Sequence, residues 1–287
     1  MALLGSLLPP VVSLTVLGVF FGALLGIASR IFAVEADLRV DQIVSCLPGG
    51  NCGGCGYPGC SAFAEAVAAG RAPTNGCVVG GNPVACEVAR IMGTEALAVQ
   101  RRAAVVKCAG SSQRAAQKYD YVGYADCGAQ HALLGGAKQC PYACCGLGTC
   151  VRACQFGAIS VVDGVAVVDR ERCTACGACV AACPMGIIQL TPYDCDHEVI
   201  CSNPLPASEV RDVCSVGCIG CELCVRSCAA GAIHMEGHLA VIDHARCVNC
   251  HVCVDRCPRG IIRYLGDRVT VVPSLGQGAE DRAAGRT

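Results

Sequence analysis

Apolar residues are distributed unevenly along this chain. Met1 to Ser29 contains no charged side chain, and Val11 to Ser29 is almost entirely apolar. About 20 apolar residues are enough for a helix to span a bilayer, so this segment is predicted to be a single transmembrane anchor, residues 1–34. The remaining sequence alternates short apolar runs with glycines and cysteines. Its length predicts two or three small domains of the α+β class.

The charges that flank the apolar segment predict its orientation. Arg30 and Arg39 follow it, and no Lys or Arg precedes it. The positive-inside rule then places the bulk of the chain on the cytoplasmic side of a bacterial inner membrane. A cleaved signal peptide is the competing interpretation. It is less favoured because a basic n-region is missing and because export would expose the cysteines to oxidation.

Three glycines recur at intervals of four within the apolar segment. Gly18, Gly22 and Gly26 therefore share one face of the predicted helix. Small residues in this pattern allow a second membrane helix to approach closely, although glycine is also simply common in membrane helices. The pattern favours, without establishing, a membrane-embedded partner.

Two apolar stretches later in the chain predict β-hairpins. Ile159 to Val168 reads as strand, Asp163-Gly164 turn and strand, and Ile233 to Ile242 repeats the pattern with Glu236-Gly237 at the turn. An acidic residue followed by glycine between apolar runs is a strong hairpin signal. Each hairpin stands between two groups of cysteines.

The cysteine groups around these hairpins have a specific spacing. Cys173 to Pro184 reads C-x2-C-x2-C-x3-C-P, and Cys247 to Pro258 repeats it. This is the spacing by which a bacterial ferredoxin binds 4Fe-4S clusters, with the fourth cysteine ligating the other cluster of a pair. Zinc sites use two separated C-x2-C pairs more often, so iron–sulfur clusters are the favoured interpretation.

The cysteines also reveal an internal duplication. A shift of 74 positions superposes nine cysteines on nine others, and the triplets Gly157-Ala-Ile and Gly231-Ala-Ile coincide as well. The pairs are Cys127/Cys201, Cys140/Cys214, Cys144/Cys218, Cys150/Cys224, Cys154/Cys228, Cys173/Cys247, Cys176/Cys250, Cys179/Cys253 and Cys183/Cys257. A shift of 29 positions relates the two halves of each copy. The region is therefore predicted to hold tandem two-cluster ferredoxin-like domains, residues 127–195 and 196–272.

Exchange of the fourth ligand predicts the cluster sets. In the second copy the sets are Cys218, Cys221, Cys224 with Cys257, and Cys247, Cys250, Cys253 with Cys228. In the first copy one set is Cys173, Cys176, Cys179 with Cys154.

The other set of the first copy lacks one cysteine. The 29-residue shift leaves Leu147 where a cysteine is required, so Cys140 or Cys145 must supply the thiolate. Cys140 is favoured because Cys145 directly follows Cys144, and adjacent residues of an extended loop point in opposite directions. The predicted set is Cys140, Cys144, Cys150 and Cys183.

A further cysteine group lies between residues 35 and 95. It reads C-x2-C-x4-C-x16-C, formed by Cys52, Cys55, Cys60 and Cys77, with glycines that allow the tight turns around a cluster. An Ala-rich helix after Cys60 would return the chain to Cys77. A small helical 4Fe-4S module is predicted, with zinc as the alternative. Cys46 and Cys86 are interpreted as packed small residues.

The stretch that surrounds this module resembles a known family. Gly22 to Glu35, followed by Leu47-Pro-Gly-Gly-Asn-Cys52 and the spacing to Cys60, is similar to RnfB, a component of the membrane-bound Rnf complex. The resemblance extends over the anchor, the module and the ferredoxin-like region, and long relatives share the C-x3-C-x5-C-x3-C spacing from Cys140. It implies a membrane-bound subunit that accepts electrons from soluble ferredoxin and passes them to other Rnf subunits, with NAD⁺ reduction coupled to Na⁺ or H⁺ translocation.

Composition restricts the function further. The chain has 28 cysteines, no Trp, and a net charge of −1 that implies no nucleic-acid partner. No nucleotide-binding glycine fingerprint, flavin attachment site or catalytic Ser/His/Asp set occurs, so no catalytic residue and no cofactor ligand beyond the cysteines is predicted. The chain is interpreted as an electron carrier. Two alternatives are a related Rsx-type subunit that keeps a redox-sensing regulator reduced, and a membrane scaffold whose clusters are structural.

Five clusters leave eight cysteines unassigned. Four of them could form a sixth cluster between the two copies, with packed free thiols as an equal alternative. This sixth set would be Cys108, Cys127, Cys201 and Cys214.

Two segments outside the cysteine groups complete the organisation. Residues 96–126 are predicted to be a connector, and its basic residues between Ala96 and Tyr119 form either a docking patch for an acidic ferredoxin or a solvated face. The Gly-, Ala- and charge-rich tail, residues 273–287, is predicted to be disordered.

Overall fold

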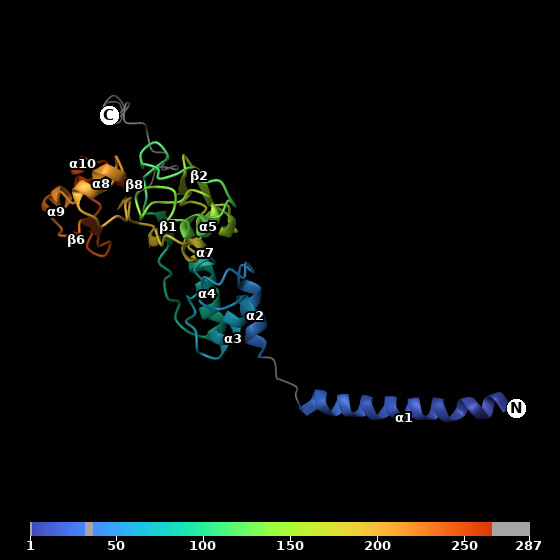
Figure 1. Ribbon diagram of the computed structural model, residues 1–287. Helices are drawn as coiled ribbons and strands as arrows, with labels where there is room; N and C mark the ends of the chain where they lie inside the picture. Colours follow the sequence, from blue (N-terminus) through green and yellow to red (C-terminus); the bar gives the residue numbers. More distant parts are fainter. Residues whose placement is uncertain (1, 32–36, 266–287) are drawn as a thin grey trace.

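A computed structural model of the chain describes residues 2–31 and 37–265. The predicted tail and the last residues of the predicted anchor lie outside the described residues. The described part contains a long N-terminal helix, a small helical module and a larger mixed α/β region that follows it (Figure 1).

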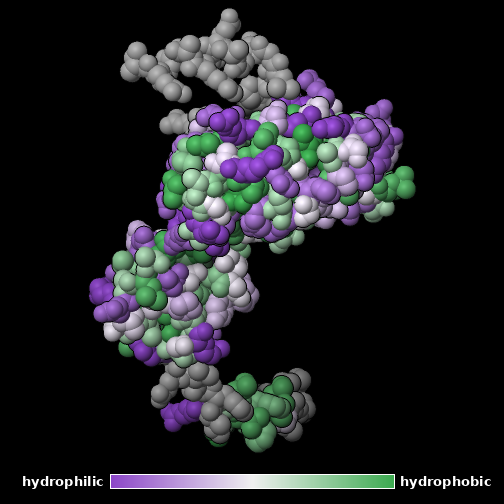
Figure 2. Space-filling view, turned by 90° about the vertical axis from the view of Figure 1, so that its left-hand side faces the viewer, coloured by the Kyte–Doolittle hydropathy of each residue, from purple (hydrophilic) through white to green (hydrophobic). Residues whose placement is uncertain are grey.

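The N-terminal helix α1 (Ala2–Ile31) fits the prediction of a membrane-spanning segment. Its stretch from Val12 to Arg30 is long and apolar enough to cross a bilayer, and none of it is buried against the rest of the protein. Figure 2 shows its described side chains as a strongly apolar body, whereas the remaining surface is mixed. Beyond the adjacent residues and the backbone of the helix itself, no atom lies within 4 Å of the Cβ position of Gly18, Gly22 or Gly26, so the glycine face is open.

Three helices form the small N-terminal module: α2 (Leu38–Cys46), α3 (Cys60–Ala68) and α4 (Gly81–Met92). The Asp37 carboxylate caps α2 by accepting a hydrogen bond from the Arg39 N–H at 2.9 Å. Gly93 ends α4 in the left-handed conformation (φ 65°) that favours glycine. Phe63, Ile43 and Val88 are fully buried at the centre, so this module has an ordinary apolar core.

The α/β region repeats one order of elements: short helix, hairpin, short helix, strand. In the first copy these are α6 (Thr149–Ala153), β2 (Ile159–Val162), β3 (Val165–Val168), α7 (Ala178–Ala182) and β4 (Ile188–Pro192). In the second they are α9 (Leu223–Ser227), β6 (Ile233–Glu236), β7 (Leu239–Ile242), α10 (Val252–Arg256) and β8 (Ile262–Tyr264). This order is the one that the 74-residue repeat predicts.

Both predicted hairpins are present. β2 and β3 pair antiparallel with Val162 opposite Val165, which leaves Asp163 and Gly164 as the two-residue turn, both with positive φ (47° and 74°). In the second hairpin Glu236 pairs with Leu239, so the turn residues are Gly237 and His238. The predicted turn there is displaced by one residue.

The segment predicted as a connector contributes a strand to the first copy. β1 (Arg102–Val106) pairs antiparallel with β4, and its four residues from Ala103 onward are buried. The equivalent strand of the second copy, β5 (His197–Val199), pairs with β8. Two further helices, α5 (Cys127–Ala132) and α8 (Ala207–Val213), precede the cysteine groups of their copies. Residues 102–106 therefore belong to the fold, because the strand pairs with β4 and the side chains of Ala104 and Val106 join the buried core of the first copy.

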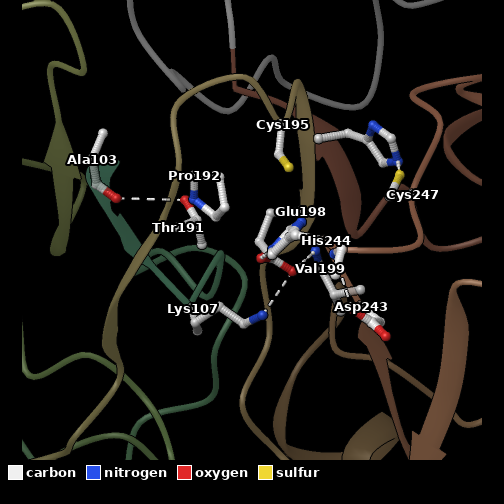
Figure 3. A network of polar contacts seen from close by, with 12 residues as sticks. Ala103, Lys107, Thr191, Pro192, Cys195, Glu198, Val199, Asp243, His244 and Cys247 are labelled. Atoms are coloured by element: carbon white, nitrogen blue, oxygen red, sulfur yellow. Dashed lines mark hydrogen bonds and ion pairs between the residues drawn. The ribbon is translucent and has the colours of Figure 1, made fainter. Parts of the chain in front are cut away.

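A buried ion pair joins the two copies. The Lys107 ammonium lies 2.8 Å from Glu198 Oε1, and the two side chains are 7% and 2% exposed. His244 Nε2 lies 2.8 Å from the other carboxylate oxygen, and Figure 3 shows both basic groups converging on Glu198. Burial by itself would raise the pKa of Glu198, but His244 and Lys107 hold it below its ordinary value. Lys107 is thereby removed from the basic surface predicted for residues 96–119.

Removal of one partner of this pair is expected to destabilise the α/β region. Lys107→Met would leave the Glu198 carboxylate buried without its ammonium partner, a change that costs about 3–5 kcal/mol in comparable pairs. The midpoint of anaerobic thermal unfolding should therefore fall clearly. Arg90→Met, which breaks the exposed pair with Glu87, serves as the control and should change the midpoint little. Equal effects of the two substitutions would contradict the role assigned to Lys107.

Candidate metal centres

The four cysteines of the N-terminal module lie together. Cys52 and Cys55 stand on a glycine-rich loop, Cys60 begins α3, and Cys77 follows the return of the chain. Cys55, Cys60 and Cys77 pack against the same buried core. Burial raises the pKa of Cys77, and the neighbouring thiols raise it further. The Gly80 N–H donates to the Cys77 sulfur at 3.4 Å. Such N–H···S bonds stabilise thiolates and tune cluster potentials.

A second group lines a cavity in the first copy. Its cysteines are Cys154, Cys173, Cys176 and Cys179. Burial raises the pKa of Cys179 to about 11, with smaller contributions from the other three thiols. The N–H of Ala104 donates to the Cys173 sulfur at 3.3 Å, and that of Ala158 to Cys154 at 3.4 Å. Strand β1 thus supplies a donor to this group.

The second copy contains two comparable groups. Cys218, Cys221, Cys224 and Cys257 line one cavity, where burial and then Cys218 and Cys257 raise the pKa of Cys224 to about 11. In the other, burial and then Cys247 and Cys250 raise the pKa of Cys253 to about 12. The Ala232 N–H donates to the Cys228 sulfur at 3.3 Å, as Ala158 does to Cys154 in the first copy.

The remaining group of the first copy differs from the sequence-based interpretation. Its cavity is lined by Cys127, Cys144, Cys145, Cys150 and Cys183, and not by Cys140. The thiols of Cys127 and Cys145 are hydrogen-bonded to each other, which lowers the pKa of Cys127 to about 5 and raises that of Cys145. Cys127 also accepts hydrogen bonds from Thr149 and from the backbone N–H of Leu147. Its sulfur therefore reaches the loop where Leu147 replaces the expected cysteine.

Cys140 lies elsewhere, with three cysteines from the tentative sixth set. A separate cavity between the two copies is lined by Cys108, Cys140, Cys201 and Cys214. The cavity linings thus group Cys127 with Cys144, Cys150 and Cys183, and Cys140 with Cys108, Cys201 and Cys214. Local spacing favoured Cys140 for the first-copy group. The 74-residue repeat instead favours the junction for Cys140, because it makes Cys140 the equivalent of Cys214.

These groups do not have the arrangement that a single metal ion requires. Two thiolates on one zinc ion stand about 4 Å apart, given Zn–S bonds of about 2.3 Å. In residues 2–31 and 37–265 no three His, Cys, Asp or Glu side chains are arranged to hold one metal ion. A cubane offers a different iron to each cysteine, so its ligands stand further apart. The groups fit clusters better than isolated ions.

Comparisons with known proteins agree with this chemistry. Family models match residues 47–79, described as "Putative Fe-S cluster", residues 166–189, "4Fe-4S binding domain", and residues 217–261, "4Fe-4S dicluster domain". The fold and the cysteine groups define an iron–sulfur protein of the ferredoxin-like class.

Three relatives, each named as the B component of its complex, are similar over most of their length. The B component of the ion-translocating oxidoreductase complex of Methanosarcina acetivorans is 43% identical to this chain, and the alignment covers 80% of this chain and 88% of the relative. That of the proton-translocating ferredoxin:NAD(+) oxidoreductase complex of Clostridium ljungdahlii is 39% identical (82% and 83%). That of the Na(+)-translocating ferredoxin:NAD(+) oxidoreductase complex of Acetobacterium woodii is 42% identical (84% and 73%). The chain belongs to the RnfB family of ion-translocating oxidoreductase complexes, and is an electron-transfer subunit of such a complex.

Removal of iron is expected to unfold the α/β region selectively. Five of the buried residues in the core of the second copy are cysteines, whereas the buried core of the N-terminal module contains none. Anaerobic chelation should therefore increase amide hydrogen exchange strongly in β2, β3, β6 and β7, and much less in α2 to α4. Unchanged exchange in the hairpins would show that the α/β region does not depend on its metal.

Proposed function

We propose that this chain accepts electrons from reduced ferredoxin and relays them to the membrane subunits of an Rnf complex. In that complex, ferredoxin oxidation and NAD⁺ reduction are coupled to Na⁺ or H⁺ translocation. The support comes from family membership, from the names of the relatives and from the cysteine groups described above. When bound, 4Fe-4S clusters supply one-electron carriers.

Five cysteine sets hold these clusters in the proposal. Four follow the sequence-based assignment, and in the fifth Cys127 replaces Cys140 as the partner of Cys144, Cys150 and Cys183. The unchanged sets are Cys52/Cys55/Cys60/Cys77, Cys154/Cys173/Cys176/Cys179, Cys218/Cys221/Cys224/Cys257 and Cys228/Cys247/Cys250/Cys253. Cys127 is preferred over Cys145 because N–H groups of the Leu147 loop already point at its sulfur.

One contact carries the proposal of a continuous route. The Gly54 backbone, between Cys52 and Cys55, packs directly on the backbone of Cys176. A Cβ atom on Gly54 would lie 2.9 Å from the Cys176 carbonyl oxygen and 3.0 Å from its Cα. Two proposed clusters, one in the N-terminal module and one in the α/β region, thus have their ligand loops in contact. Electron tunnelling falls steeply with distance, so such a contact is what a relay requires.

The far end of the route is open to a soluble donor. Cys250 is exposed, and Val248 beside it is 69% exposed. Among the cysteines of the five proposed sets, only Cys250 is exposed. We assign this end to ferredoxin, and the N-terminal module to the membrane side, because α1 precedes that module in the chain. Arg30 and Arg39 after the apolar stretch favour a cytoplasmic position for both.

The proposal is tested by anaerobic reduction of the full-length chain in detergent. Reduced ferredoxin should bleach the cluster absorbance within the mixing time of a rapid-kinetics experiment, and electron paramagnetic resonance should show low-potential signals. Zinc instead of iron, or clusters that ferredoxin cannot reduce, would overturn the electron-transfer role and leave a scaffold.

Crowding at the Gly54 contact should slow transfer into the N-terminal module. In Gly54→Ala the new methyl group meets backbone atoms that cannot yield, so the two ligand loops must separate. The paramagnetic signal of the N-terminal cluster is identified as the one that is lost in Cys52→Ser. In rapid-freeze experiments on Gly54→Ala, this signal should appear several-fold more slowly than in the parent chain. Gly50→Ala is the matched control, since a Cβ there meets nothing within 4 Å. Equal rates in the two variants would exclude the contact as part of the route.

A further inference from the structure

The cavity between the two copies is formed by four cysteines that no ferredoxin spacing groups together. Cys108 follows β1, Cys140 lies between α5 and α6, Cys201 follows β5 and Cys214 follows α8. Two ligands therefore come from each side of the junction. The sulfurs of Cys108 and Cys214 both face Gly110, at 3.7 and 3.6 Å from the position of a Cβ there.

We propose that Cys108, Cys140, Cys201 and Cys214 bind a sixth 4Fe-4S cluster that connects the two ferredoxin-like copies. The inference rests on the proposed function, which it extends by one carrier and a different ligand set.

The cavity has the size of the neighbouring cluster sites. Together with the solvent space at its mouth its volume is about 350 Å³, compared on the same basis with about 360 Å³ for the cavity of Cys218 and 310 Å³ for that of Cys144. Cys140, Cys201 and Cys214 are each less than one-tenth exposed. A cluster here would be shielded from water on most sides.

Hydrogen-bond donors already point at the sulfurs, as they do in the other sites. The Asn203 amide, itself 2% exposed, donates to the Cys140 sulfur at 3.4 Å. The N–H of Cys144 donates to the Cys108 sulfur at 3.4 Å. The Cys201 sulfur accepts from the N–H groups of Cys218 and Asn203. Packed thiols would not need this set of donors, whereas cluster-bound thiolates do.

Two of these donors connect the site to its neighbours. Cys144 and Cys218 are repeat equivalents, and each is a proposed ligand of the nearest cluster in its own copy. Each also donates its N–H to a sulfur of the cavity. The cavity therefore lies between the two adjacent cluster sites, and two of its cysteine sulfurs accept hydrogen bonds from a proposed ligand of each. A cluster bound there would stand between the proposed clusters of the two copies and could supply a one-electron carrier between them.

Buried charges also fit a negatively charged group here. Lys138 is 7% exposed and donates to the carbonyl oxygens of Gly110 and Gly164 at 2.7 and 2.8 Å. Among the described residues no carboxylate pairs with it. A buried ammonium ion needs a compensating charge. Cluster-bound thiolates at Cys144 and in the cavity would supply this negative charge. The cavity thiolates are near Lys138, because Lys138 binds the carbonyl oxygen of Gly110, and Gly110 faces two of the cavity sulfurs.

The ion pair of Lys107 and Glu198 holds the site together. Lys107 immediately precedes Cys108, and Glu198 lies three residues before Cys201. Their contact fixes the two chain segments that bring these cysteines to the junction (Figure 3).

Iron and sulfide content of the anaerobically purified full-length chain tests the proposal. Six clusters correspond to about 24 irons and five to about 20. Cys86 is exposed, and not packed as the sequence suggested, and it lies outside every proposed set. Cys214→Ser should therefore lose about four irons, while Cys86→Ser should lose none. About 20 irons in the parent chain, unchanged in Cys214→Ser, would overturn the sixth cluster and leave the five-cluster relay intact.

Double variants test the ligand set. If Cys140 and Cys214 bind the same cluster, Cys140→Ser with Cys214→Ser should lose about four irons in total, whereas Cys127→Ser with Cys214→Ser should lose about eight. The reverse pattern would restore the assignment of Cys140 to the Cys144 set. Retention of the remaining paramagnetic signals shows in each case that the variant has folded. Zinc throughout would instead refute the proposed function as a whole.

Discussion

A shortage of large apolar side chains governs this structure. The chain has five Phe, no Trp and 28 Cys, and the buried clusters of its α/β region consist of Val, Ile, Ala and one Leu interleaved with cysteine. Such a core buries little apolar area and so cannot offset the conformational entropy of the chain. Burial also raises the pKa of thiols such as Cys201 and Cys253 to about 12, so the sulfurs resist ionisation without metal. Cluster binding resolves both problems, because it fills the cavities and stabilises the thiolates.

The N-terminal module is organised differently, and this has a functional meaning. Phe63, Ile43 and Val88 give it a core that does not depend on cysteine. Its cluster loop is therefore carried on a self-sufficient helical body and pressed against the α/β region through Gly54. A glycine is required there because any side chain would collide with the Cys176 backbone. The two parts are thus in contact through the ligand loops of two proposed clusters.

Local features of this fold were predictable from the sequence, and distant ones were not. The N-terminal helix, both hairpins and the repeated order of elements depend on residues close together in the chain, and the structure contains them. Strand β1 was missed because it pairs with β4 about 85 residues later. The proposed exchange of Cys127 and Cys140 likewise depends on residues that are distant in the chain. Spacing describes how one loop surrounds a cluster, but not which distant thiol completes it.

That exchange follows from how the duplication diverged. In the second copy Cys221 completes the loop set, which leaves Cys201 free to face the junction. In the first copy Leu147 stands at the equivalent position, and Cys127, the equivalent of Cys201, reaches that loop instead. The junction then lacks one of its four symmetric ligands, and Cys108 from the end of β1 occupies that place. In this proposal the loss of one cysteine is therefore linked to the recruitment of strand β1 into the fold. The strand brings Cys108 to the junction and Lys107 to Glu198, so one segment both completes the metal site and binds the two copies together.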